Sequence, residues 1–127
     1  MGNRAVIEFE SKGIGIYLHH DGGRDSVEAF LEVAKEYKAH DGSDYTIARL
    51  TQIIGNYIGG ILSLGIGPIQ YLDRDNYDNG VYVINDSLDI IDRYYNRNPE
   101  QYFQDKEQLK EDIRAANDQF FTGANLS

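Results

Sequence analysis

Three glycine-containing segments constrain the fold of this chain more than any other feature. They are GIYLHHDGGRDSVEAFLE (15–32), ARLTQIIGNYIGG (48–60) and DRDNYDNGVYVI (73–84). Each puts glycine beside charged or aromatic residues where one element is expected to end and another to begin. Glycine at such a junction permits a positive φ, or lets another group approach the backbone closely. No pairing of a nucleophile with a base stands out, so the sequence favours binding over bond breaking.

The composition is typical of one globular domain. The chain has 127 residues, of which 41% are hydrophobic and 26% charged, enough to bury a core without disulfides. It has no cysteine, which excludes a disulfide framework and fits a reducing cytosol. No segment approaches the ~18 apolar residues of a membrane span, and the N-terminus lacks an apolar run of signal-peptide length.

The net charge limits the possible partners. At −9, the chain would repel a long polyanion, so binding of polymeric nucleic acid is not expected. A small phosphorylated ligand remains possible, because one or two arginines and a few backbone N–H groups can hold it locally.

The first third of the chain predicts a hairpin and a helix. Alternating apolar and polar residues over 4–10 and 14–18 are typical of two paired strands. Helical spacing then predicts an amphipathic helix over 25–39, with Asp25 as its N-cap and Glu28 completing a capping box.

The middle of the chain predicts a second helix over 45–58. Gly55 inside it costs roughly 1 kcal/mol against alanine, so we expect another helix, a symmetry mate or a ligand to pack closely there. A short strand is predicted over 61–66. Asp78-Asn79-Gly80 is the strongest hairpin signal in the chain. The apolar run 81–84 predicts a strand buried on both faces or at an interface.

The last forty-odd residues are less regular. The segment 88–95 fits either a helix or a strand, whereas 105–121 predicts a polar helix with a thin apolar stripe. Such a helix must dock on its own sheet or on a partner subunit, so 105–121 is a candidate oligomerisation arm. The predicted fold is a single α+β domain over 1–127: a small antiparallel sheet opened by an N-terminal β-hairpin, two central helices and a C-terminal helix.

The segment Gly22-Gly23-Arg24 is a candidate anion site. Two glycines can expose backbone N–H groups at the positive end of a helix, and Arg24 adds a planar fork of donors. The segment lacks the lysine and spacing of a Walker loop. A tight turn with Arg24 paired to a surface carboxylate explains the same residues, and spacing alone favours that interpretation.

Arginines also lie near aromatic residues in the second half of the chain. Arg93 precedes Tyr94, and Arg114 falls within the C-terminal helix. A purine held between an aromatic ring and a guanidinium gains on the order of 1–3 kcal/mol, and Asn56 or Asp92 could read ribose hydroxyls. Alternatively, the tyrosines pack in an interface and Arg114 pairs with a carboxylate of its own helix.

Metal-site patterns are weak. His19 and His20 are neighbours on a predicted strand, so their side chains point to opposite faces and cannot easily chelate one ion. Asp73, Asp75 and Asp78 fail the spacing of an EF-hand loop. We therefore predict no metal site, no cofactor and no catalytic residue.

Four blocks of the sequence resemble those of a known family. GIYLHHDGGRDSVEAFL, ARLTQIIGNYIGG, LSLGIG and DNGVYVI occur in this order between Ile14 and Asp92. They are similar to the shared blocks of the Thoeris anti-defence sponge family, first-described type, of phages and prophages. The resemblance implies a viral α+β protein that acts in the cytoplasm of the bacterial host as a homodimer or higher oligomer. It also implies immune evasion by sequestering, without cleavage, the glycocyclic ADP-ribose signals of TIR-domain enzymes.

The resemblance further implies where the nucleotides bind. In the family, adenine is sandwiched at a dimer interface between an aromatic ring and an arginine of the C-terminal helix, here Tyr82 and Arg114. Some members hold cyclic oligonucleotides at a separate site between subunits. We expect Gly22, Gly23 and Arg24 to serve such a second, phosphate-binding site.

Two other functions fit the sequence. A nucleotide hydrolase using Asp73, Asp75 or Asp78 with a metal would show chelator-sensitive turnover. An acidic interaction protein that inhibits a host defence protein would bind a basic partner with strong salt dependence. The expectation that we carry forward is a non-enzymatic homo-oligomer that binds a small signalling nucleotide and neither polymeric nucleic acid nor membrane.

Overall fold

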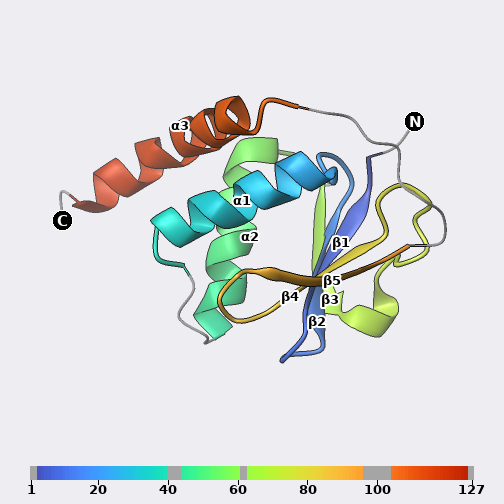
Figure 1. The fold of residues 1–127 in the computed structure, drawn as a ribbon. Helices are drawn as coiled ribbons and strands as arrows, with labels where there is room; N and C mark the ends of the chain where they lie inside the picture. The colour runs from blue at the N-terminus through green and yellow to red at the C-terminus, as the bar shows by residue number, and fades with distance from the viewer. Residues whose placement is uncertain (1–2, 40–43, 61–62, 96–103, 126–127) are drawn as a thin grey trace.

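Five strands form one mixed sheet in the order β3-β2-β1-β4-β5, and the α-helices lie on one side of it (Figure 1). This computed structural model describes residues 3–39, 44–60, 63–95 and 104–125, with residues 121–125 described by their backbone alone. Along the chain the elements are β1 (Ala5–Phe9), β2 (Ile14–Leu18), α1 (Arg24–Glu36), α2 (Asp44–Ile58), β3 (Leu64–Pro68), the 3₁₀ helix η1 (Ile69–Tyr71), β4 (Val81–Ile84), β5 (Ile90–Tyr94) and α3 (Lys106–Asn125).

The predicted α+β class and N-terminal hairpin are confirmed, but the sheet is mixed. β1 pairs antiparallel with β2, β2 with β3, and β4 with β5. β4 instead runs parallel to β1. The chain returns from the helices to the outer edge of β2 as β3, then crosses to the other side of β1, where β4 runs in the same direction as β3 and β1. The ambiguous segment 88–95 contains the edge strand β5.

The hairpin predicted at Asp78-Asn79-Gly80 is wrong, because the strands that flank this turn are not neighbours. The segment folds around Asn76 instead. The side-chain oxygen of Asn76 accepts hydrogen bonds from the backbone N–H groups of Asp78, Asn79 and Gly80 at 2.9–3.1 Å. Gly80 has a φ of 66°. The buried amide therefore holds a turn that delivers the chain to β4 without strand pairing.

The start of α1 also differs from the prediction. The N-cap is Gly23, with no side-chain capping hydrogen bond. The carboxylate of Asp25 accepts the backbone N–H of Gln104 at 2.9 Å instead of capping its own helix. The predicted capping box is thus wrong, because a contact distant in sequence uses the carboxylate.

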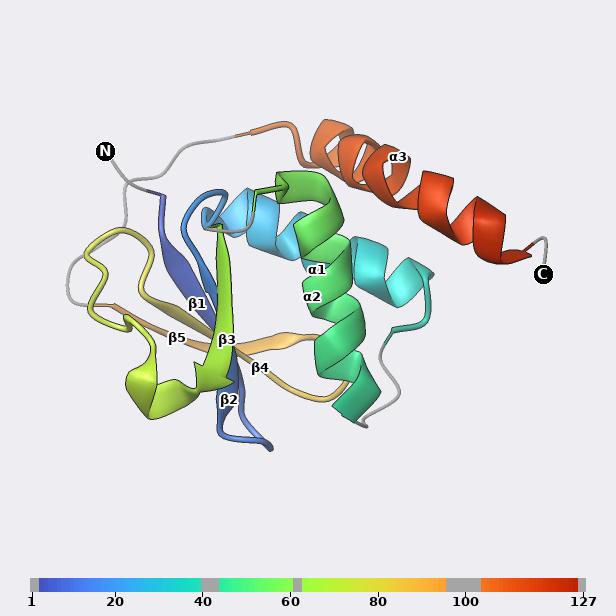
Figure 2. The ribbon, with the colours of Figure 1, turned by 180° about the vertical axis from the view of Figure 1, so that it is seen from behind.

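Gly55 has a close neighbour, as expected, but it is a strand of the same chain and not a helix, a symmetry mate or a ligand. A Cβ at Gly55 would lie 3.3 Å from Cδ1 of Leu64. The group that packs there is the start of β3, which follows α2 in the chain and lies beside it (Figure 2). Glycine therefore lets α2 lie close to the edge strand of its own sheet.

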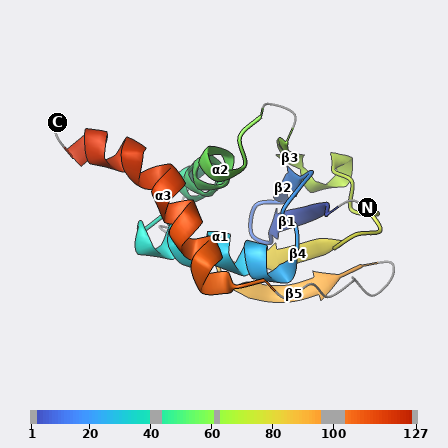
Figure 3. The ribbon, with the colours of Figure 1, turned by 90° about the horizontal axis from the view of Figure 1, so that it is seen from above.

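α3 docks on α1 and α2 of its own chain, and not on the sheet (Figure 3). Its buried apolar anchors are Leu109 and Ile113. Ion pairs reinforce this thin stripe: three carboxylates one helical turn apart on α1 face three cations spaced the same way on α3. They are Glu28, Glu32 and Glu36 opposite Lys106, Lys110 and Arg114. The C-terminal end of α3 extends past the other helices (Figure 1).

The main core lies between the sheet and the helices. It joins residues such as Phe9, Phe30, Leu50 and Ile84. A smaller cluster of Val6, Val81 and Val83 lies on the opposite face, where Ile69 and Leu72 pack against it. β4 is consequently buried on both faces, as its sequence predicted. Within the described segments, no helix is both long and apolar enough to cross a membrane.

Candidate functional site

The centre of the candidate site is the buried ring of Tyr82 in β4. The side chain is fully buried on the face of the sheet that the helices cover. Its hydroxyl donates a hydrogen bond to the carbonyl oxygen of Gly22 at 2.8 Å. Burial raises the pKa of Tyr82 to about 12, so the phenol stays protonated and remains a donor. This bond holds the glycine turn before α1 against β4.

Arg93 covers the Tyr82 ring. The two residues are register partners in β5 and β4, and the guanidinium carbon lies 3.8 Å from the ring centroid. The same carbon lies 5.4 Å from the ring of Tyr95. Nη2 donates to the backbone oxygen of Asn79 at 2.7 Å, whereas the buried Nε has no hydrogen-bond partner among the described residues.

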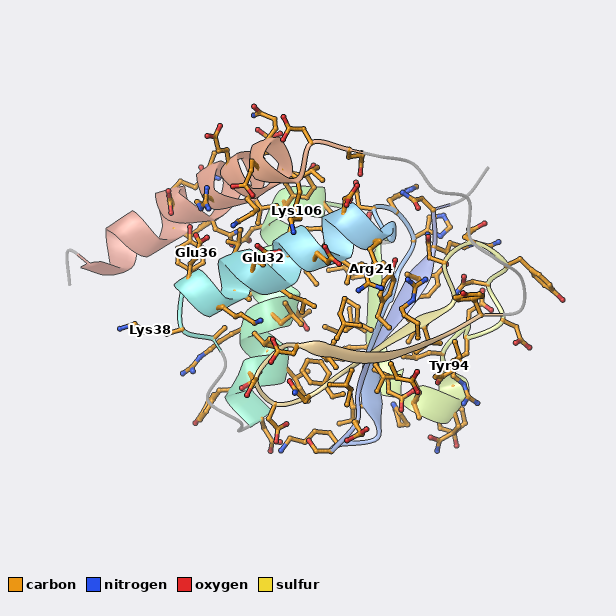
Figure 4. All side chains as sticks on the ribbon, viewed as in Figure 1. Arg24, Glu32, Glu36, Lys38, Tyr94 and Lys106 are labelled. Atoms are coloured by element: carbon orange, nitrogen blue, oxygen red, sulfur yellow. The ribbon has the colours of Figure 1, made fainter. Side chains whose placement is uncertain are left out.

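Arg24 brings a second guanidinium to this place. It is the first residue of α1 (Figure 4), and its Nε donates to Glu28 at 2.6 Å. Burial lowers the pKa of Arg93, and the positive charge of Arg24 adds to this effect whereas Tyr82 and Tyr95 oppose it. Two like charges near one another are costly unless a counter-charge compensates them. Glu28 supplies part of that compensation.

The glycine turn is sterically required. A Cβ at Gly22 would lie 2.6 Å from both Cβ of Ala5 and the backbone oxygen of Asn3. Gly23 is less confined, since a Cβ there would meet only Asn3 at 3.7 Å. The turn thus leaves the N-terminus of α1, the positive end of its dipole, beside the two arginines. We call Tyr82, Arg93, Gly22, Gly23 and Arg24 the arginine cluster.

The arginine cluster combines residues that the sequence assigned to two different sites. Tyr82 and Arg93 were expected to bind the ADP-ribose-type signal, and Gly22, Gly23 and Arg24 a second phosphate ligand. Within one chain they adjoin one another. The other interpretation of the glycine segment was a tight turn with Arg24 paired to a surface carboxylate. That pairing is present, because Arg24 pairs with Glu28.

The remaining predicted residues lie elsewhere. The side-chain oxygen of Asn56 accepts from Gln52 at 2.9 Å, and its Nδ2 donates to Asn117 at 2.8 Å, between α2 and α3. Arg114 makes two hydrogen bonds to Glu36 at 2.6 and 2.8 Å. This pairing crosses from α3 to α1, and not along α3 as the alternative interpretation proposed.

Asp92 and Tyr94 lie on the face of the sheet opposite the helices. Their register partners, Val83 and Val81, belong to the small cluster on that face. The Tyr94 hydroxyl donates to Glu8 at 2.6 Å. In Figure 4, Tyr94 lies on the side of η1, across β5 from Arg24. Asp92 and Tyr94 therefore lie on one face of β5 and Arg93 on the other.

Sequence reasoning missed two sets of polar residues. Asn79 supplies the carbonyl that holds Arg93, and the sequence suggested only a turn there. Gln70 and Arg74 belong to the segment after β3; the aspartates around Arg74 were considered from the sequence, but neither of these two residues was. They line a surface cleft together with Tyr94. Only the assembled fold brings these residues to the end of β5.

The carboxylates considered for a metal have other partners. Asp78 accepts a hydrogen bond from Nε of Arg4 at 2.7 Å, and Asp73 lies 3.7 Å from Nη1 of the same arginine. His19 and His20 stack edge to face, with their ring centroids 4.7 Å apart. In the part of the chain that the structure describes, no group of three histidine, aspartate or glutamate side chains could hold a metal ion.

Comparison with known proteins gives no relative. No protein-family model, curated protein or solved structure matches the chain significantly.

Proposed function

We propose that this protein is a phage-encoded sponge that binds and sequesters cyclic ADP-ribose-type immune signals, glycocyclic ADP-ribose in particular, without cleaving them. It would thereby block TIR-based (Thoeris) antiviral defence. The resemblance of the glycine-containing blocks suggests this function. The observation that carries it is the arginine cluster, where two guanidiniums and a helix N-terminus adjoin tyrosine rings in a chain of net charge −9.

The cluster has the chemistry that a nucleotide diphosphate requires. Arg24 and Arg93 can neutralise two phosphate charges, and backbone N–H groups at the start of α1 can complete the hydrogen bonding. A phosphate would also relieve the repulsion between the two guanidiniums, which are otherwise balanced in part by Glu28. Tyr95, 43% exposed and beside Arg93, offers a ring on which a base can stack.

The adenine sandwich that the resemblance implies needs more than one copy of the chain. Tyr82 is fully buried beneath Arg93, and Arg114 is engaged by Glu36 on another element. A sandwich between Tyr82 and Arg114 would require Arg93 to move aside and a second copy to supply Arg114. We therefore retain the homo-oligomer, and a further site for cyclic oligonucleotides between subunits, as parts of the proposal.

Binding without cleavage is favoured by the state of the carboxylates. Asp73 and Asp78 pair with Arg4, and Glu28 pairs with Arg24. For Asp78, hydrogen bonds and positive charge from Arg4 outweigh burial and lower the pKa, so this carboxylate is a poor general base. A hydrolase is accordingly the weaker alternative.

Calorimetry with glycocyclic ADP-ribose tests the proposal, followed by heat release and mass spectrometry of the ligand. We expect tight binding and chemically intact recovery. Arg93→Ala and Arg24→Ala should each weaken binding about tenfold or more, since each removes a charged contact. Arg49→Ala, an exposed arginine on α2, is the matched control. Absence of binding would contradict the sponge, and altered ligand would favour the hydrolase.

Arg114→Ala separates the two binding geometries. If binding is lost with Arg114→Ala but retained with Arg24→Ala, the base lies at an interface between copies, as the resemblance implies. If Arg24→Ala and Arg93→Ala fail together while Arg114→Ala binds normally, the arginine cluster is the site.

The acidic interaction protein remains a second candidate, favoured by the net charge of −9. It predicts no nucleotide affinity, and binding to a basic host protein that weakens steeply with salt.

A further inference from the structure

A cleft opens on the sheet face opposite the helices, away from the arginine cluster. Its volume is about 600 Å³, within the range of roughly 300–1,000 Å³ that small-molecule sites occupy. The segment around and after η1 forms one wall and the end of β5 forms the other. The polar and aromatic lining residues are Gln70, Asp73, Arg74, Asp75, Tyr94 and Tyr95.

Two tyrosines give the cleft aromatic surface. Tyr94 and Tyr95 are 40% and 43% exposed, so part of each ring is open to a ligand. The Tyr94 ring is fixed in place, because its hydroxyl donates to Glu8 and also contacts Arg74. Exposed rings held in this way are suited to stacking on a planar group.

The charges in the cleft oppose an anionic ligand. The charged lining residues are two carboxylates, Asp73 and Asp75, and one guanidinium, Arg74. Glu8 adds a further negative charge beside Tyr94. Nη1 of Arg4 lies 3.7 Å from Asp73, but Nε of Arg4 lies closer to Asp78, at 2.7 Å. The carboxylate of Asp78 therefore balances much of the positive charge of Arg4. A phosphate would meet net repulsion here, in contrast to the arginine cluster.

The polar groups suit the edges of a heteroaromatic ring. Carboxylates accept hydrogen bonds from ring amines and sugar hydroxyls, whereas the Arg74 guanidinium donates to ring nitrogens and carbonyls. Gln70 can do both through its amide. This mixture of donors and acceptors beside aromatic rings is the usual way of recognising an uncharged base with its sugar.

We propose that this cleft is a second binding site, specific for a nucleoside-type ligand: a planar heteroaromatic ring with hydroxyls and without phosphate. The register of β5 points Arg93 to the helix face and Tyr94 to the opposite face, so the cleft and the arginine cluster lie on different faces of the sheet. Tyr95 adjoins both sites, whereas Gln70, Arg74 and Tyr94 belong to the cleft alone.

An NMR titration of the full-length ¹⁵N-labelled protein tests the site, with adenosine, adenosine 5′-monophosphate and inorganic phosphate as probes. We expect adenosine at millimolar concentration to shift the amide signals of 70–75 and 94–95. The monophosphate should bind several-fold more weakly than adenosine at low salt, and phosphate should leave these signals unchanged. No shift at these residues with adenosine, or tighter binding of the monophosphate there, would overturn the proposal.

Variants localise the effect. Tyr94→Ala and the exposed Arg74→Gln should each weaken adenosine binding, by roughly tenfold for the loss of a stacked ring. Tyr71→Ala, which removes an 80% exposed ring near the cleft, should not. Arg24→Ala should also leave adenosine binding unchanged. Adenosine binding that survives both cleft variants would overturn the proposal, whereas failure of glycocyclic ADP-ribose to bind the wild type would contradict only the sponge.

Discussion

Arg93 lies over Tyr82, with its guanidinium carbon 3.8 Å from the ring centroid, while the Tyr82 hydroxyl donates a hydrogen bond to Gly22. One tyrosine thus links β5, β4 and the turn before α1. The arrangement has measurable consequences for stability as well as for binding.

Tyr82→Phe should destabilise the fold. The substitution keeps the ring under Arg93 but removes the only hydroxyl that reaches Gly22 among the described contacts. Leaving a buried carbonyl oxygen without its donor costs about 1–3 kcal/mol. Urea denaturation followed by circular dichroism measures this loss. Tyr71→Phe, at an 80% exposed position, is the control and should change the free energy of unfolding little. Equal stabilities for the two variants would contradict a structural role for the bond.

Gly22→Ala should destabilise the protein much more than Gly23→Ala. The new methyl group at Gly22 would lie 2.6 Å from Cβ of Ala5 and from the backbone oxygen of Asn3, so the backbone must shift. Overpacking of this kind costs about 1–3 kcal/mol. At Gly23 the nearest atom would be 3.7 Å away, and an N-cap change from glycine to alanine costs less than about 1 kcal/mol. Thermal denaturation of both variants measures which is the less stable. A lower melting temperature for Gly23→Ala than for Gly22→Ala would contradict the structure.

Asn117→Ala should loosen α3. The buried Asn117 side chain donates to the backbone oxygens of Ile53 and Ile113 at 3.1 and 2.8 Å and accepts from Asn56. Its removal leaves polar groups of α2 without partners, at a cost of about 1–3 kcal/mol. In the variant, amide hydrogen exchange over 106–125 should speed up relative to wild type, and by more than the exchange in β1 and β4. Gln119→Ala, on the exposed surface of α3, serves as the control. Unchanged exchange in α3 would mean that apolar and ionic contacts alone hold the helix.

Asp78 should make stability depend on acidity. Burial raises the pKa of Asp78, but hydrogen bonds from Arg4 and its positive charge outweigh burial, so the pKa lies below the ordinary 3.8. A carboxyl group with a pKa lowered by folding stabilises the folded state above its unfolded pKa. That stabilisation is lost as the pH falls through the folded pKa. The free energy of unfolding should therefore fall as the pH drops below about 4.

Urea denaturation at a series of pH values measures the contribution of Asp78. Asp78→Asn should be less stable than wild type at neutral pH and should lose less stability on acidification. Asp44→Asn, in which the original side chain is 95% exposed, should follow the wild-type pH dependence. If the free energy of unfolding of Asp78→Asn changed with pH as steeply as that of wild type, the pairing of Asp78 with Arg4 would not be the source of the pH dependence.

The secondary structure followed from local patterns. Strand alternation identified β1 and β2, and helical spacing identified α1 and α2 to within a few residues of their bounds. Gly55 indicated a close neighbour, and Leu64 is that neighbour. These predictions succeeded because period and glycine content depend on residues that are near one another in the sequence.

Contacts between distant segments decided the rest. No local pattern indicated that β4 would pair in parallel with β1. Asp78-Asn79-Gly80 is locally a hairpin signal, and only the Asn76 amide and the order of strands override it. Asp25 was predicted as a helix cap, but its carboxylate accepts a hydrogen bond from the backbone N–H of Gln104, which is distant in the sequence. Arg93 and Arg24 are far apart in the chain, so the effect of the Arg24 charge on Arg93 depends on β5 pairing with β4 and on the Gly22 turn. Sequence alone thus determined which residue types were available for binding. The tertiary structure decided which of them share a face, because side-chain direction in a sheet is set by register and neighbouring strands.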